Sequence, residues 1–281
     1  STQSRISTAR TRAINPTHVF ATAPATTDYK SDVPDEGVTY VGDLGSDIYN
    51  GIQENGSYLV DGNVNYDMDF GKAVISLYVK GTITPTKLYL KAGSTLYLTS
   101  GSKLILGHYS FGQTGVKVYL ASGATIECTG DLLQFSNSLL YNAGTIKAKS
   151  IQDAGGGHIY NQGTFELSNE ISVENNNSEI VNDGTITAAR LHTAGSGHVQ
   201  NNGDLTISGN TDIDSNNNTW VNNGHYRTQY FNYIAGSNDV INNCFLTVDE
   251  DFNINHGDNA GDFGFRMDTG AGVLTKNFYG D

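Results

Sequence analysis

The sequence predicts an all-β fold, a single-stranded parallel β-helix (a solenoid) with repeats of about 20 residues. Three observations lead to this prediction. An asparagine recurs at that interval, apolar residues alternate after each recurrence, and further apolar pairs lie between recurrences. One such repeat cannot bury its apolar face alone, whereas stacked repeats share a continuous core.

The recurring element is an asparagine followed, two residues later, by glycine, which Cys244 replaces in the last repeat. The asparagines are Asn142, Asn161, Asn182, Asn201, Asn222 and Asn242. The residues after the glycine alternate, as in Phe165 and Leu167, and alternation of period two is typical of a strand. We expect the glycine to supply backbone angles that other residues avoid, so that Asn-x-Gly marks a bend.

Two more apolar segments occur in each repeat. One follows the first strand, as at Ile171 and Val173, and one directly precedes the asparagine, as at Ile180 and Val181. Together they indicate three faces per coil. The segment that ends in His158 returns in the segment that ends in His198, which indicates that alternate coils share similar loops.

The periodicity divides the chain into four parts. We expect an N-terminal arm or linker at 1–37, an N-terminal cap at 38–74, the parallel β-helix at 75–255, and a C-terminal cap, or the stub of a longer chain, at 256–281. The first part contains Arg5, Arg10 and Arg12 and has no periodicity. It is either a flexible tether or an arm lying on the first coil.

Composition excludes several partners. The net charge of −13 argues against nucleic acid and against anionic membrane surfaces. No apolar run approaches the roughly 20 residues of a membrane span. Cys128 and Cys244 lie several coils apart, which is too far for a disulfide, so we expect two free, buried thiols.

The bend asparagines resemble the asparagine ladder of right-handed parallel β-helices such as the pectate lyases. Their amides would then hydrogen-bond along the stack. The repeat composition over about residues 75–255 also resembles adhesin-like, surface-exposed β-helix proteins of Bacteroidota-type bacteria. This resemblance implies an extracellular location or the bacterial outer cell surface.

Tyrosines provide the candidate ligand-binding residues. Tyr78, Tyr97 and Tyr119, together with Tyr89, each lie between two aliphatic residues, so the rings should point to solvent. The first three are about one coil apart and could stack along one face. Exposed aromatic rows bind sugar rings or protein partners. Two alternatives remain open, namely that tyrosine is simply a good strand former, or that the neighbouring arm covers the rings.

Acidic residues provide a candidate calcium site. Asp249, Asp251 and Asn253 should share one outward face, with Asp212 and Asp214 at similar offsets in preceding coils. Calcium takes six to eight oxygen ligands, but a plain solvated face is the alternative. The segment from Asp258 to Asp262 is a second candidate of this kind. His158 and His198 occupy equivalent loop positions, which repetition explains better than catalysis.

These observations favour a secreted or cell-surface binding protein that presents β-helix faces to glycans or to host or bacterial surface proteins. Neither catalysis nor a cofactor is expected, apart from the candidate calcium. The alternative is a polysaccharide lyase or glycoside hydrolase on the same scaffold, which predicts Asp or Glu next to Lys, Arg or calcium on adjacent coils. Ice binding is disfavoured, because Lys147, Glu166 and Arg227 interrupt any uniform threonine face.

Overall fold

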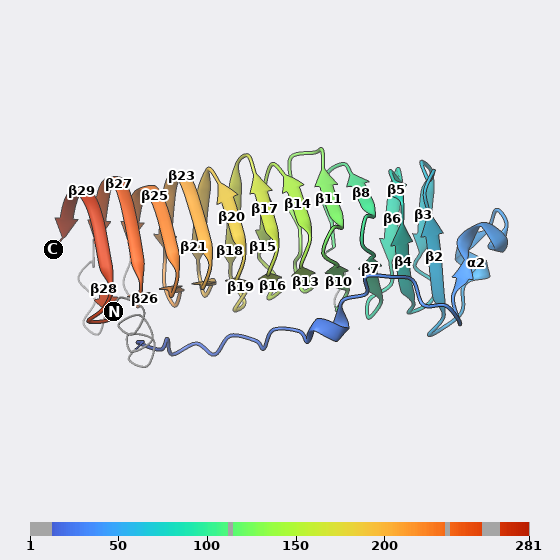
Figure 1. Cartoon of the computed structure of the whole chain (residues 1–281), viewed down its shortest axis with the longest axis horizontal. Helices are drawn as coiled ribbons and strands as arrows, with labels where there is room; N and C mark the ends of the chain where they lie inside the picture. Colours follow the sequence, from blue (N-terminus) through green and yellow to red (C-terminus); the bar gives the residue numbers. More distant parts are fainter. Residues whose placement is uncertain (1–12, 112–114, 234–236, 255–264, 281) are drawn as a thin grey trace, which may run out of the picture.

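The chain forms a parallel β-helix, as predicted (Figure 1). The computed structural model describes residues 13–111, 115–233, 237–254 and 265–280. Each coil contributes one strand to a first sheet, and its other strands belong to a second sheet, apart from one separate pair in the early coils. All strand pairs among the described residues are parallel. Neighbouring strands in a sheet are therefore separated by one full coil of the chain.

The first sheet contains the segments that end in the recurring asparagine. Its strands, in spatial order, are β1 (Thr39–Tyr40), β2 (Ser57–Asp61), β4 (Ser76–Lys80), β7 (Thr95–Leu98), β10 (Lys117–Leu120), β13 (Leu139–Asn142), β16 (His158–Asn161), β19 (Glu179–Asn182), β22 (His198–Asn201), β24 (Thr219–Asn222), β26 (Asp239–Asn242) and β28 (Phe265–Met267).

The second sheet contains two rows of strands, which correspond to the two other faces expected from the sequence. One row is β5 (Thr82–Ile83), β8 (Lys103–Leu106), β11 (Thr125–Cys128), β14 (Thr145–Ala148), β17 (Thr164–Leu167) and β20 (Thr185–Ala188). The other row is β9 (Tyr109–Ser110), β12 (Leu133–Gln134), β15 (Ile151–Asp153), β18 (Glu170–Glu174) and β21 (Arg190–Ala194).

The two rows merge in the later coils, where a single long strand with a register irregularity serves both. These strands are β23 (Asp204–Asp214), β25 (His225–Tyr233), β27 (Phe245–Ile254) and β29 (Gly272–Gly280). A separate pair, β3 (Asp67–Phe70) and β6 (Lys87–Leu90), completes the early coils.

The core is a continuous apolar column along the axis. Alternate residues of each strand point into it, as the period-two pattern predicts, so that Phe165, Ile171 and Ile180 of one coil are all buried. Each Å² of apolar surface that a coil buries contributes roughly 25 cal/mol to folding, so every coil stabilises the stack.

The asparagine ladder is confirmed. The six residues align in register and are buried, and each side-chain amide donates to the next side-chain oxygen. The Nδ2–Oδ1 distances run from 2.8 Å for Asn142 to Asn161 up to 2.9 Å for Asn222 to Asn242. Each amide also bonds backbone carbonyls at the bend, which satisfies groups that the strands leave open.

The glycine at the bend has a different role from the one we expected. Gly163, Gly184, Gly203 and Gly224 do not have positive φ angles. A Cβ atom on Gly184 would instead lie 2.1 Å from the carbonyl oxygen of Gly163 in the preceding coil. Glycine is therefore required because successive backbones approach closely, and not because of an unusual backbone angle.

A second amide ladder, which sequence reasoning missed, lies on the outside of the same bend. Asn202 donates to Asp183 at 2.6 Å, Asn223 donates to Asn202 at 2.9 Å, and Asn243 donates to Asn223 at 2.8 Å. The repeated Asn-Asn-Gly is its signal in the sequence.

The solenoid is longer than the predicted range of 75–255. At one end, β2 and β3 already form a coil within the expected cap at 38–74, and the short strand β1 and the helical segments η3 (Val41–Leu44) and α2 (Ile48–Gly51) lie beyond them (Figure 1). At the other end, β28 and β29 pair with the preceding coil, although they fall in the expected C-terminal cap or stub at 256–281.

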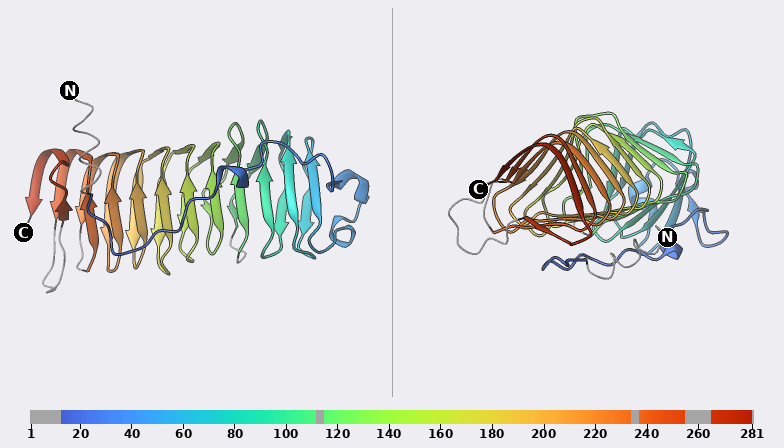
Figure 2. Two further views of the ribbon diagram at one scale, coloured as in Figure 1. Left: turned by 60° about the horizontal axis from the view of Figure 1, so that its bottom comes forward. Right: turned by 60° about the vertical axis from the view of Figure 1, so that its left-hand side comes forward.

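The N-terminal arm runs lengthwise across the strands of the first sheet (Figure 2). Its residues 13–37 include one short helical turn, η2 (Thr26–Asp28). Ile14 bonds Asn243 near one end of the solenoid, and the carbonyl of Ser31 accepts from the amide of Ser100 many coils away. The arm thus spans much of the solenoid and is not confined to the first coil.

The two cysteines are free, as expected. Cys128 is buried and donates to the carbonyl of Gly107 at 2.9 Å. Cys244 is only partly buried, so the expectation of two buried thiols is wrong for this residue. Within the described ranges, no helix has the length and apolar character needed to cross a membrane.

Candidate functional site

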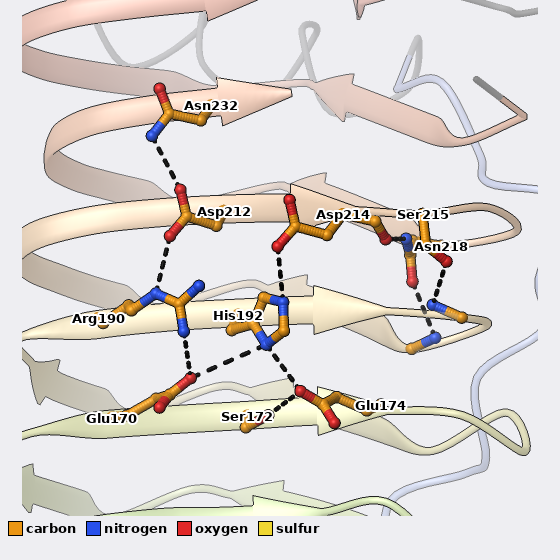
Figure 3. Close-up of polar contacts among 12 residues, drawn as sticks. Glu170, Ser172, Glu174, Arg190, His192, Asp212, Asp214, Ser215, Asn218 and Asn232 are labelled. Carbon is orange, nitrogen blue, oxygen red and sulfur yellow. Dashed lines mark hydrogen bonds and ion pairs between the residues drawn. The ribbon is translucent and has the colours of Figure 1, made fainter. Parts of the chain in front are cut away.

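A cluster of charged side chains lies on the outer face of the second sheet, on three consecutive coils (Figure 3). Its members are Glu170 and Glu174 from β18, Arg190 and His192 from β21, and Asp212 and Asp214 from β23. We call these six residues the acidic cluster. The alternating residues between them, such as Ile171 and Leu191, are buried in the core, so the strand pleat turns the charged side chains outward.

Arg190 links two carboxylates on either side of its own coil. Its Nη1 atom lies 2.7 Å from Oε1 of Glu170, and its Nε atom lies 2.7 Å from Oδ2 of Asp212. Burial alone would lower the pKa of Arg190, but the hydrogen bond to Asp212 and the surrounding carboxylates outweigh burial and raise this pKa. The guanidinium is therefore held as a cation in a fixed orientation.

His192 links a second pair of carboxylates in the same way. Its Nδ1 atom lies 2.7 Å from Oε1 of Glu174, and its Nε2 atom lies 2.7 Å from Oδ2 of Asp214. Ser172 also donates to Glu174, at 2.8 Å. Both ring nitrogens thus lie within hydrogen-bond distance of carboxylate oxygens, which fixes the orientation of the ring.

Polar contacts extend the cluster along the sheet. Asn232 donates to Asp212 at 2.8 Å, and Asn253 donates to Asn232 at 2.8 Å. On the other side, Glu170, Arg190 and His192 line a depression of about 440 Å³, which also includes Ser150 and Gln152. The result is a shallow groove that is lined mainly by hydrogen-bonding groups.

Unused acceptor capacity remains in this groove, at Glu170 and Glu174, and beside it, at Asp214. The contacts of Glu170 and Glu174 use only Oε1, and those of Asp214 use only Oδ2. The second oxygen of each carboxylate can therefore accept hydrogen bonds from a ligand. Among the residues that the structure describes, no group of three His, Cys, Asp or Glu side chains is arranged to hold a metal ion.

The tyrosine row is stacked, but it is not a solvent-facing surface. Tyr78 and Tyr97 have ring centroids 4.9 Å apart, Tyr97 and Tyr119 are 5.4 Å apart, and Tyr141 continues the stack. However, Tyr78 and Tyr119 are only 7% and 8% exposed, and Tyr29 of the arm packs edge-on against Tyr119. The expectation that these rings are exposed is therefore wrong.

Tyr97 of this row is partly buried. Burial raises the pKa of Tyr119 to about 12. Tyr89 lies in β6, outside the first sheet, and is exposed as expected. The candidate binding residues Tyr78, Tyr97 and Tyr119 therefore do not form an open ligand surface while the arm is in place.

The candidate calcium ligands do not come together. Asp249 forms an ion pair with Arg227 at 3.0 Å, Asp251 accepts from Asn277 at 2.9 Å, and Asn253 bonds Asn232. The irregular register between Val248 and Asp251 interrupts the simple alternation on which the prediction depended. The second candidate, from Asp258 to Asp262, lies outside the described residues.

His158 and His198 lie at the first positions of β16 and β22 and not in loops, with Glu179 of β19 between them. Nδ1 of His158 is 2.6 Å from Oε1 of Glu179. His18 of the arm places Nε2 at 2.7 Å from Oε2 of Glu179 and stacks on His198 with ring centroids 3.6 Å apart. We call His18, His158, Glu179 and His198 the histidine clasp.

Acidification is expected to loosen the arm between about pH 6.5 and pH 4. Burial, together with charge on the adjacent His18, lowers the pKa of His198 to about 4. Because this pKa lies below the ordinary value, the contribution of His198 is complete above about pH 6.5 and is lost as the pH falls through about 4. Hydrogen exchange in residues 14–21, corrected for intrinsic rates, should therefore accelerate over this range.

Glu179, Asn177 and Thr219, which surround His198, do not change charge in this window. Burial tends to raise the pKa of Glu179, but hydrogen bonds from His158, His18 and the amide of Ala21 hold it at about 2. Asn177 and Thr219, which bond the ring nitrogens of His198, are neutral. A His198→Gln variant should retain arm protection across the window. Unchanged protection of the unmodified chain down to pH 4 would contradict the expectation.

The acidic cluster as a whole was not recognised from the sequence, which singled out only Asp212 and Asp214 and assigned them to the candidate calcium site, although a signal for the cluster exists. Glu-x-Ser-x-Glu, Arg-x-His and Asp-x-Asp occupy corresponding positions of three consecutive repeats. Aligning the repeats by strand register would have placed them side by side. Comparison of the chain with protein-family models, with curated proteins and with solved structures finds no match in any of the three.

Proposed function

We propose that the chain is an extracellular or cell-surface binding protein that binds a glycan in the groove of the acidic cluster. The observation that supports this proposal is the arrangement in Figure 3, where Arg190 and His192 hold four carboxylates on the two flanking coils. The location follows the resemblance to surface-exposed β-helix proteins and is part of the proposal.

The chemistry of the groove favours a neutral glycan. Carboxylate oxygens accept from sugar hydroxyls, and guanidinium nitrogens donate to sugar oxygens. Four carboxylates against two basic side chains would repel an acidic polysaccharide, and the net charge of −13 adds to this repulsion. Ion pairing fixes the side chains before the ligand arrives, which reduces the entropy cost of binding.

Replacing Arg190 by methionine tests this proposal. The variant should bind a neutral polysaccharide at least about tenfold more weakly, which corresponds to about 1.4 kcal/mol. The reason is that the variant loses one donor and the orientation of Glu170 and Asp212. Affinity electrophoresis against neutral and acidic polysaccharides, after a neutral-glycan array, measures the change.

The matched control is Arg227→Met. Arg227 also pairs with a carboxylate of an adjacent coil, Asp249, on the same sheet, but it lies outside the groove. Its replacement should leave glycan affinity unchanged. If no neutral glycan binds the unmodified chain, or if both variants lose affinity equally, the groove is not the binding site.

A glycoside hydrolase is the second candidate function. One observation favours it, namely that Glu174 and Asp214 flank His192 from adjacent coils, since paired carboxylates are the usual acid and base of glycosidases. This function predicts release of reducing ends from a neutral polysaccharide, with a loss of at least about 100-fold in Asp214→Asn. Asp249→Asn is the control. Binding without release of reducing ends would exclude this candidate.

A further inference from the structure

We propose that the first sheet carries a second binding site, a groove for an extended polypeptide segment. Residues 14–21 of the arm fill this groove in the structure, and the same residues of a second copy of the chain fit it equally well. The proposal is independent of the glycan site, which lies on the other sheet.

The arm has the alternation of an extended segment that is recognised along one side. Ile14, Pro16, His18 and Phe20 are partly buried, whereas the residues between them are exposed, and Val19 is 87% exposed. This period of two is the pattern of an extended chain. The side chains of every second residue therefore provide the contacts with the groove.

The groove binds the backbone of the arm through side chains. Oδ1 of Asn243 accepts from the amide of Ile14 at 2.9 Å, and Nδ2 of Asn243 donates to the carbonyl of Ile14 at 2.8 Å. Asp239 accepts from the amide of Thr17, and Glu179 accepts from the amide of Ala21, both at 2.9 Å. The coils already pair with one another in this sheet, so a segment that crosses the strands depends on such side-chain acceptors.

Two side chains of the arm give the recognition its specificity. His18 lies flat on His198, with an angle of 4° between the rings, and it also reaches Glu179. Phe20 packs edge-on against His18 with ring centroids 4.7 Å apart. The groove therefore recognises a His-x-Phe segment whose backbone amides face buried carboxylates, because Glu179 is 6% exposed and Asp239 is 8% exposed.

None of these contacts depends on the covalent connection between arm and solenoid. They join residues that are 158 to 229 positions apart in the sequence. The connecting segment 22–37 is mostly exposed, although Tyr29 and Ser31 within it also contact the solenoid. The charges are also complementary, since Arg5, Arg10 and Arg12 precede the bound segment and the chain as a whole is acidic. An arm from a second copy can thus make the same contacts.

The attached arm competes with any arm supplied by another molecule. Covalent attachment gives it an effective concentration on the order of mM, so exchange between unmodified copies is suppressed in dilute solution. The test must therefore weaken the arm in one copy and the groove in the other.

The experiment mixes two full-length variants. Copy 1 carries Glu179→Gln, which removes the negative charge and turns into a donor one of the two oxygens that bond His18 and the amide of Ala21. Copy 2 carries His18→Ala and Phe20→Ala, which leaves its groove intact. Each copy alone should sediment as a monomer, and the mixture should form a complex of one arm with one groove. A copy 2 that also carries Glu179→Gln should form none. Circular dichroism confirms that each variant retains the solenoid.

A labelled peptide of residues 13–22 provides an independent readout. It should bind copy 2 at least tenfold more tightly than it binds copy 1. The same peptide with His18→Ala should bind neither. If the mixture stays monomeric at concentrations on the order of 1 mM, or if the peptide binds both copies equally, the groove does not recognise the arm in trans and the proposal is wrong.

Discussion

Replacing Gly184 by alanine is expected to lower the free energy of unfolding by roughly 3 kcal/mol or more. The added Cβ would lie 2.1 Å from the carbonyl oxygen of Gly163 and 2.7 Å from the carbonyl oxygen of Gln162. Both atoms belong to the backbone of the preceding coil, which is fixed by its own pairing, so no side chain can move aside. Urea denaturation followed by circular dichroism measures the change.

Gly107→Ala is the matched control. A Cβ at Gly107 has no heavy atom within 4 Å, and the φ angle of this residue is not positive. Alanine should therefore be neutral or slightly stabilising there, within about 1 kcal/mol. If the two variants unfold at the same urea concentration, the close approach of the coils is not what requires glycine at position 184.

In a separate variant, replacing Asn182 by alanine is expected to lower the free energy of unfolding by about 3 kcal/mol. The amide of Asn182 donates to Asn201 and to the carbonyls of Gly184 and Asp204. Its oxygen accepts from Asn161 and from the amide of Gly184. Alanine leaves several of these partners buried without a hydrogen bond, and each such group costs about 1–3 kcal/mol.

Asn202→Ala separates burial from hydrogen bonding in this experiment. Asn202 also belongs to a ladder, with bonds to Asp183 and Asn223, but it is exposed. Water can replace its partners, so the loss should stay below about 1 kcal/mol. Equal losses in the two variants, measured as free energies of unfolding, would show that burial of the inner ladder has no special effect.

The inner ladder could be predicted because one residue type recurs at a constant interval and coils of equal length place the recurrences in one column. The stacking of Tyr78, Tyr97 and Tyr119 followed from the same logic. Their burial under the arm was one of the alternatives that the sequence could not decide between, since the arm that carries Tyr29 has no periodicity and its position depends on contacts with residues far away in the sequence.

The acidic cluster was missed for a different reason. Its residues differ from coil to coil, so Glu170, Arg190 and Asp212 do not look like a repeat, although they meet in space. A search for identical residues finds columns such as the inner ladder. A search for complementary charges in the aligned repeats is needed to find a site of this kind.

The inner ladder has one direction along the whole solenoid. Every asparagine from Asn142 to Asn222 donates its amide to the following coil and accepts from the coil before it wherever a ladder residue precedes it. Each of these coils therefore presents the same hydrogen-bond donor to the coil that follows it and the same acceptor to the coil that precedes it. The molecule can gain or lose whole coils during evolution, in pairs where loops alternate, without any remaining asparagine having to find a new kind of partner.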